Sequence, residues 1–195
     1  MATPYRFLGR IDALPYNGVE PVFVLDTGAI IDLEEKDKIG LRAFLARSST
    51  VAIAVPEVLA EIRRNHNTVI GQRRIIETST LESLELLAER TRSIATAIAE
   101  HEQYDTHRYL AMETANEDCC EKKRRRDPIS RADTHTIAVA LTLAAHADEL
   151  NLPGRYPVVL TSDEHLYRPI TRLSNPLHDN HHDGYRCVIV LRTRP

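Results

Sequence analysis

Four acidic side chains stand where predicted strands end or predicted helices begin. Asp26 follows one buried apolar run, and Asp163 follows a second. Asp133 lies in the first turn of a predicted helix, and Glu61 lies about a turn and a half inside another. Strand ends and helix starts share one edge of a parallel α/β sheet, so we expect the four carboxylates to converge on one cleft.

Converging carboxylates would need a cation. Two carboxylates about 4 Å apart repel each other by roughly 4 kcal/mol at an effective dielectric constant near 20. Oxygen donors with no converging His or Cys suit a hard ion, and a small, partly hydrated set of carboxylates fits Mg²⁺ or Mn²⁺ better than a dedicated Ca²⁺ cage. A bound divalent ion polarises a phosphoryl oxygen and lowers the pKa of a coordinated water. The four acids therefore predict metal-assisted cleavage of a phosphodiester.

Each acid also has a simpler interpretation. An Asp after a strand commonly caps the next helix, and Asp133, with Ser130 three residues earlier, fits ordinary helix-start chemistry. Glu61 could be a solvated helix acid that pairs with Arg64 or Asn65. It is the joint placement of the four acids that favours a functional site.

Alternating strand and helix patterns should position these acids. We expect strands at PVFVL, TVAIAV, YPVVLT and RCVIVLR, with helices between them. This alternation favours an α/β fold with a parallel sheet and right-handed crossovers. Residues 1–20 have no sustained periodicity and are expected to form an irregular arm before a single domain over 21–195.

Two predictions concern the helices alone. The stretches TGAIIDLEEKDK and IGLRAFLAR suggest two successive helices after Asp26. From about residue 67 to 123 the pattern is helical throughout, with Leu81, Leu84 and Leu87 spaced at threes and fours. We expect this stretch to form an inserted helical hairpin at about 67–127.

Composition limits the function classes. The net charge of −3 gives no global field that would attract nucleic acid, so any contact with a polyanion must be local. No apolar stretch reaches the roughly 18 to 20 residues that a membrane span needs. The three cysteines form no CxxC pair, which favours a reducing compartment. We therefore expect a cytoplasmic protein that does not bind membranes.

Four short segments resemble the signature segments of PIN-domain ribonucleases, the group that includes VapC toxins. In chain order they are VLDTGAII, VPEVLAEI, ADTHTIAVALTLA and LTSDEHL. The resemblance covers most of residues 21 to 167 apart from the helical stretch, and implies a PIN-like three-layer fold with a central, mainly parallel sheet flanked by helices. It also implies RNA cleavage with one or two Mg²⁺ or Mn²⁺ ions. The implied metal-binding and catalytic acids are Asp26, Glu61, Asp133 and Asp163, and the implied assisting hydroxyls are Thr161 or Ser162.

The resemblance leaves some choices open. Glu57 competes with Glu61 for the second acid position, and the LAE context favours Glu61. The toxins are shorter than this chain, in which roughly 55 residues of predicted helix lie between the second and third acids. The insertion could cover the cleft, bind a partner or select the RNA. Implied partners are an RNA substrate, an antitoxin protein and a second copy of the chain.

Two further clusters each have a functional and a simpler interpretation. Lys122, Lys123, Arg124, Arg125 and Arg126 could contact RNA phosphates or simply form a basic helix end. The histidines of HDNHHDG, within residues 172–184, are more typical of a polar loop than of a metal site.

Two alternative functions remain open at this point. One is a catalytically inert PIN-like module that binds RNA or protein, and the other is a structure-specific DNA nuclease of the same superfamily.

Overall fold

The computed structural model describes most of the chain between residues 21 and 192. The described ranges are 21–47, 50–66, 69–70, 73–74, 76–121, 129–153, 155–163, 166, 168–170, 172–173 and 189–192. The predicted arm at 1–20 lies outside them, as do the basic cluster at 122–126 and the histidines of the HDNHHDG segment.

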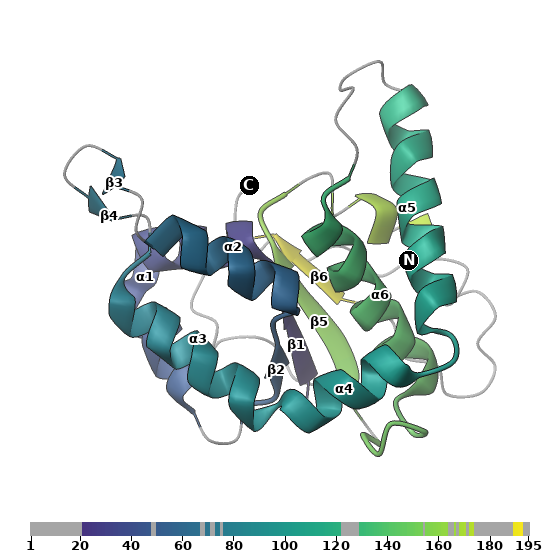
Figure 1. Cartoon of the computed structure of the whole chain (residues 1–195), viewed down its shortest axis with the longest axis horizontal. Helices are drawn as coiled ribbons and strands as arrows, with labels where there is room; N and C mark the ends of the chain where they lie inside the picture. Colours follow the sequence, from purple (N-terminus) through teal and green to yellow (C-terminus); the bar gives the residue numbers. More distant parts are fainter. Residues whose placement is uncertain are drawn as a thin grey trace.

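A parallel sheet forms the centre of the molecule (Figure 1). Its strands are β1 (Pro21–Leu25), β2 (Ala52–Ile53), β5 (Tyr156–Thr161) and β6 (Ile189–Arg192), in the order β2-β1-β5-β6. Every neighbouring pair runs parallel, and Leu25 of β1 is in register with Leu160 of β5. The apolar residues of β1 and the four residues 158–161 of β5 are buried, which is the pattern of strands covered on both faces. The predicted α/β class with a parallel sheet is confirmed.

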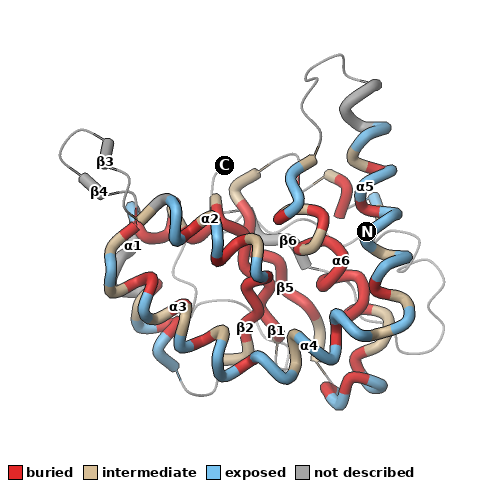
Figure 2. The backbone as a smooth tube through the Cα atoms, viewed as in Figure 1, coloured by how far each residue is buried: buried red, intermediate tan, exposed pale blue. Residues whose placement is uncertain are grey.

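The helices α1 (Thr27–Ala46), α2 (Pro56–His66) and α6 (Arg131–His146) connect or flank these strands. Helix α6 contacts β1 and β5, and α1 contacts β5. Helix α6 is buried over most of its length, and many of its buried residues are small or β-branched. Side chains of this size allow the helix to pack closely against the sheet. Figure 2 shows the buried residues concentrated on the strands and on the helix faces turned toward them.

Helix α1 corrects one prediction. The chain forms one continuous helix from Thr27 to Ala46 where two had been expected. A glycine inside a helix costs only about 1 kcal/mol relative to alanine, so Gly40 in the sequence need not end it. Burial of Leu41, Phe44 and Leu45 in the second half outweighs that cost, since each large apolar side chain contributes roughly 1.5–3 kcal/mol.

The insertion is not helical throughout, so that prediction is also wrong. It begins with the short antiparallel pair β3 (Val69–Ile70) and β4 (Arg73–Arg74), where the β-branched pair Val69-Ile70 favours a strand. Three helices follow in place of a hairpin: α3 (Thr78–Arg90), α4 (Arg92–Glu100) and α5 (Tyr104–Glu121). Thr91 separates the first two and its hydroxyl donates to the carbonyl of Leu87.

The inserted helices pack on both sides of the core. Helix α3 contacts α1 and α2 through the buried Leu81, Leu84 and Leu87, whereas α5 contacts α6. In Figure 1, α3 and α4 curve around the lower left of the sheet, and α5 lies outside α6. Within the described residues, every helix is too short or too polar to cross a membrane.

Candidate active site

Asp26 directly follows strand β1, and its carboxylate does not cap helix α1. It occupies the N-cap position of α1 with an extended backbone, but its side chain makes no capping hydrogen bond. Instead, its Oδ2 accepts a hydrogen bond of 2.9 Å from the Thr161 hydroxyl at the end of β5. Only 5% of Asp26 is exposed. The simple capping interpretation is therefore wrong for this residue.

Thr161 connects two of the acids. Its hydroxyl donates to Asp26 and accepts the backbone N–H of Asp163 at 3.0 Å. Because β1 and β5 are paired in parallel register, the ends of both strands meet at the same edge of the sheet. The threonine thus holds the backbone of Asp163 next to the carboxylate of Asp26.

Glu61 reaches the same edge from α2. Its Oε2 accepts a hydrogen bond of 2.7 Å from the hydroxyl of Thr27, the residue that follows Asp26. Thr27 was not singled out by the sequence, although its position directly after Asp26 was a usable signal. The bond places the Glu61 carboxylate beside the end of β1.

Asp133 belongs to the start of α6. The Ser130 side chain caps this helix by accepting the backbone N–H of Asp133 at 3.0 Å, and the Asp133 carboxylate is in turn hydrogen-bonded to Ser130. This is a reciprocal capping arrangement, so the simpler interpretation of Asp133 holds in part. Its carboxylate is also close enough to Asp163 and Glu61 for their charges to raise its pKa.

The electrostatics show that the four acids form one group. The pKa of Asp26 is raised to about 7, chiefly by burial and then by the charges of Asp133, Asp163 and Glu61, while the hydrogen bond from Thr161 lowers it. Burial also raises the pKa of Asp133 to about 6, with contributions from Asp163 and Glu61 and an opposing one from Ser130. Each raised pKa means that the crowded site resists negative charge.

A glycine lets two side chains approach the backbone closely beside this group. A Cβ atom at Gly28 would lie 2.6 Å from the Ser162 hydroxyl oxygen and 3.3 Å from Oδ2 of Asp26. Any larger residue would therefore press on both side chains. The position of Ser162 beside Gly28 and Asp26 is compatible with the assisting role that the resemblance implies for it.

Glu57 is engaged elsewhere. Its Oε1 pairs with Nε of Arg131 at 3.1 Å and lies 3.6 Å from Nε2 of His135. His135 in turn shares a 2.8 Å hydrogen bond with the Tyr104 hydroxyl of α5. Glu57 is not among the charges that raise the pKa of Asp26, whereas Glu61 is. The geometry therefore favours Glu61 as the second acid of the group.

The acids do not form a closed coordination shell. Among the described residues, the one group of three His, Cys, Asp or Glu side chains with all ligand atoms within 4.8 Å of one another lies elsewhere in the molecule. No three of the four acids therefore bring a carboxylate oxygen within that distance of one another. Mg²⁺ and Mn²⁺ sites do not require three, since such ions often bind through one or two carboxylates.

No protein-family model, curated protein or solved structure matches this chain. The functional interpretation consequently depends on the residues themselves.

Thr161 offers a test of the site's positioning. Thr161→Val keeps the size of this fully buried side chain but removes both hydrogen bonds to the acids. We expect the activity of the site to fall by roughly 10- to 100-fold, the usual cost of losing a group that orients a metal ligand. Thr142→Val is the matched control, because it also removes a fully buried hydroxyl, one that bonds His107 on α5. An equal loss of activity in both variants would show that Thr161 acts only through stability.

Proposed function

We propose that the chain is a divalent-metal-dependent endoribonuclease with a PIN-like fold. The observation that carries this proposal is the grouping of four carboxylates from four separate elements at the carboxyl edge of a parallel sheet. The raised pKa values of Asp26 and Asp133 give the physical reason for expecting a cation there. RNA as the substrate class comes from the resemblance of the four sequence segments.

The residues present fit Mg²⁺ or Mn²⁺. The donors are carboxylate oxygens, and Gly28 lets the Asp26 carboxylate and the Ser162 hydroxyl lie close together. Asp26, Glu61, Asp133 and Asp163 would hold the ion. When bound, a divalent ion supplies charge stabilisation at the phosphoryl group and a more acidic water.

The protein's own residues position these acids. Thr161 orients Asp26 from β5, and Thr27 orients Glu61 from the start of α1. Ser130 fixes the first turn of α6 and thereby the backbone of Asp133. These bonds come from rigid elements, so the carboxylates are held in place before substrate binds, which is how a site avoids reorganisation during reaction.

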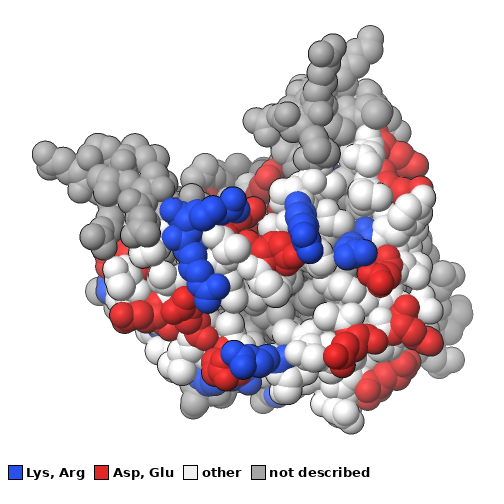
Figure 3. Space-filling view, viewed as in Figure 1, with Lys and Arg blue, Asp and Glu red and all other residues white. Residues whose placement is uncertain are grey.

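The surface near the site carries the charges that RNA binding would use. In Figure 3, Lys and Arg side chains gather over α2 and over the start of α6, with acidic side chains between them. Exposed residues of α2 and of the start of α6 include Arg63 and Arg131, which pair with Glu85 and Glu57 respectively. The basic cluster at 122–126 lies outside the described residues, and its contact with RNA stays a prediction.

A cleavage assay tests the proposal directly. Purified protein is incubated with single-stranded RNA, single-stranded DNA and a flapped DNA duplex, each in Mg²⁺, Mn²⁺ or EDTA. We expect internal cleavage of RNA with either metal and none in EDTA, restored when the metal is added back. Cleavage of the DNA substrates alone would assign a different nuclease activity. RNA binding without cleavage in either metal would favour the inert module.

The two glutamates of α2 should differ in their effects. Glu61→Gln should lower the cleavage rate by at least ~10-fold, because it removes a charge from the acid group and weakens a metal ligand. Glu57→Gln should be milder, because Glu57 pairs with Arg131 outside that group. Initial rates measured side by side over a range of Mg²⁺ concentrations check this order. If Glu57→Gln lowers the cleavage rate more than Glu61→Gln does, then Glu57 is the second acid of the group.

An antitoxin partner, a homodimer and a cytoplasmic location also belong to this proposal. They derive from the sequence resemblance and composition described above.

A further inference from the structure

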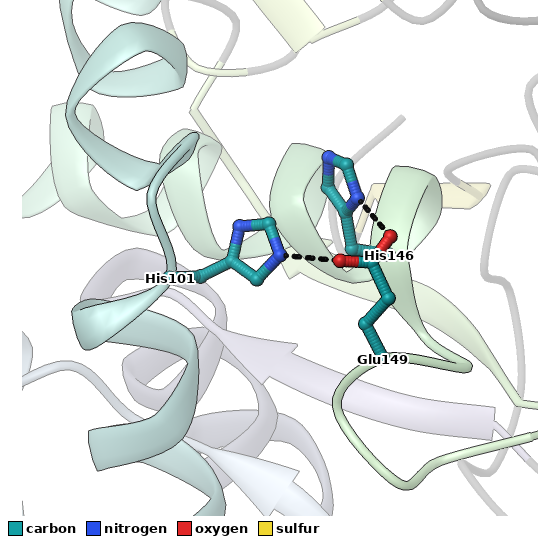
Figure 4. Close-up of side chains that lie close together, drawn as sticks. All are labelled: His101, His146 and Glu149. Carbon is teal, nitrogen blue, oxygen red and sulfur yellow. Dashed lines mark hydrogen bonds and ion pairs between the residues drawn. The ribbon is translucent and has the colours of Figure 1, made fainter.

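Two histidines and a glutamate meet at the opposite end of α6 from the acids. His146 lies in the last turn of α6, Glu149 in the turn that follows, and His101 in the connection between α4 and α5. Nδ1 of His146 lies 3.0 Å from Oε1 of Glu149, and Nε2 of His101 lies 3.2 Å from Oε2 of the same carboxylate. Figure 4 shows both rings turned toward the Glu149 carboxylate.

These atoms lie close enough together to bind one metal ion. One ligand atom from each of His101, His146 and Glu149 lies within 4.8 Å of the other two. Two imidazole nitrogens and one carboxylate oxygen suit Zn²⁺, whereas Mg²⁺ prefers oxygen donors alone. Three protein ligands would leave a fourth position for water.

Accessibility also suits an exchangeable ion. The His101 and His146 side chains are 10% and 22% exposed, while that of Glu149 is 65% exposed. The imidazoles are thus held in place by packing, and the carboxylate opens the site to solvent. The His101 and His146 ring centres lie 4.3 Å apart, and the His107 ring centre lies 6.1 Å from that of His146, so a third imidazole is close by.

We propose that His101, His146 and Glu149 form a Zn²⁺ site that fastens the α4–α5 connection to the end of α6. This site is separate from the acid group, because Asp133 and His146 lie 13 residues apart on one helix, or roughly 20 Å at 1.5 Å per residue. It is a binding site with a structural role. It does not depend on the proposed nuclease activity.

Binding would replace the two hydrogen bonds between the histidines and Glu149 and break a third, between Gln103 and His101. Nδ1 of His101 accepts the backbone N–H of Gln103 at 3.2 Å, so Nε2 carries the ring proton in the arrangement seen here. Coordination through Nε2 moves that proton to Nδ1, which then no longer accepts the Gln103 N–H. A bond of 3.2 Å is at the long end of its range, so a metal–nitrogen bond outweighs it.

Zn²⁺ titration of the full chain tests the site. Metal-stripped protein is titrated with ZnCl₂ by calorimetry in excess Mg²⁺, which occupies sites that prefer oxygen ligands. We expect wild type to bind one equivalent of Zn²⁺ at this site. The Glu149→Gln variant should bind that equivalent at least 10-fold more weakly, and the His101→Ala/His146→Ala double variant should not bind it. The exposed position of Glu149 keeps the first variant free of packing changes.

A matched control separates this site from other zinc ligands in the chain. His178, His181 and His182 are replaced together by alanine, which should leave the equivalent assigned to His101 and His146 unchanged. Co²⁺ substitution supplies a second readout, since a four-coordinate nitrogen and oxygen site gives visible absorption bands that should disappear in Glu149→Gln. Equal Zn²⁺ stoichiometry and affinity in wild type and in both site variants would overturn the proposal.

Discussion

Asp26→Asn should abolish metal-dependent RNA cleavage, with a loss of more than about 100-fold, while the protein stays folded. The substitution keeps the shape of a side chain that is only 5% exposed, and the amide oxygen can still accept the hydrogen bond from Thr161. What it removes is a negative charge at the centre of the acid group. Loss of a group that merely orients a ligand already costs 10- to 100-fold, so loss of the ligand itself should cost more.

The assay for this prediction compares initial rates of RNA cleavage in Mg²⁺ and in Mn²⁺. Asp133→Asn and Asp163→Asn should behave like Asp26→Asn, because their carboxylates are coupled to Asp26 through space. Asp105→Asn is the matched control, since it removes an exposed carboxylate on α5 that pairs with Arg108. Cleavage by purified Asp26→Asn protein at the wild-type rate would remove Asp26 from the mechanism.

Asp26→Asn should also stabilise the metal-free protein at alkaline pH. Burial first, and then the neighbouring acids, raise the folded pKa of Asp26 from its ordinary 3.8 to about 7. The unfolded chain therefore ionises this group at lower pH than the folded chain does. Stability is lost as the pH rises from near 4, and the loss is complete above about 7. The full cost approaches roughly 4 kcal/mol at 1.36 kcal/mol per pKa unit.

Asparagine carries no such cost, so the expected gain depends on pH. In EDTA at pH 8, the Tm of Asp26→Asn should exceed that of wild type by several degrees, at about 2–4 °C per kcal/mol for a chain of this size. Near pH 4 the two proteins should melt together, because the wild-type carboxyl is then protonated in the folded state. A lower Tm for Asp26→Asn at pH 8 would contradict the repulsion that the structure implies.

A divalent ion should reduce the difference in Tm between Asp26→Asn and wild type at pH 8. At a Mg²⁺ or Mn²⁺ concentration of about 100 times Kd, binding to the folded state adds about 2.7 kcal/mol to wild-type stability. Asp26→Asn should gain little, because one of its ligands is weakened. Thermal melts at pH 8 with and without metal measure the difference.

The sequence was most informative where one local feature decided the structure. The apolar runs before Asp26 and before Asp163 predicted buried parallel strands, and β1 and β5 are such strands. Ser130 predicted the start of α6, because its side chain can satisfy a free backbone N–H there. In these cases the types of residue in a short segment are enough to predict the element that it forms.

The sequence was less informative where tertiary packing decided. The sequence suggested two helices over residues that form the single helix α1, whose second half is held by buried apolar side chains. The choice between Glu57 and Glu61 depends on Arg131 and His135, which lie on a helix far along the chain. The helical pattern after residue 67 concealed both the β3–β4 pair and the division into three helices.

Some site residues could likewise be predicted from local sequence, whereas others depend on tertiary packing. The acids could be named from their places at strand ends and helix starts. Thr27 could not be assigned its role without knowing that Glu61 approaches from α2. Likewise His101 and His146 are separated by 45 residues, and no short motif brings them together before the α4–α5 connection is placed beside α6.

Calorimetric titration of the metal-stripped protein with Mn²⁺ at pH 7.5 tests the central claim most directly. We predict saturable uptake of Mn²⁺ by wild type, reduced at least ~10-fold in affinity by Asp26→Asn and by Asp133→Asn but unchanged by Asp105→Asn. Identical Mn²⁺ binding in wild type and in both acid variants would show that these carboxylates hold no ion.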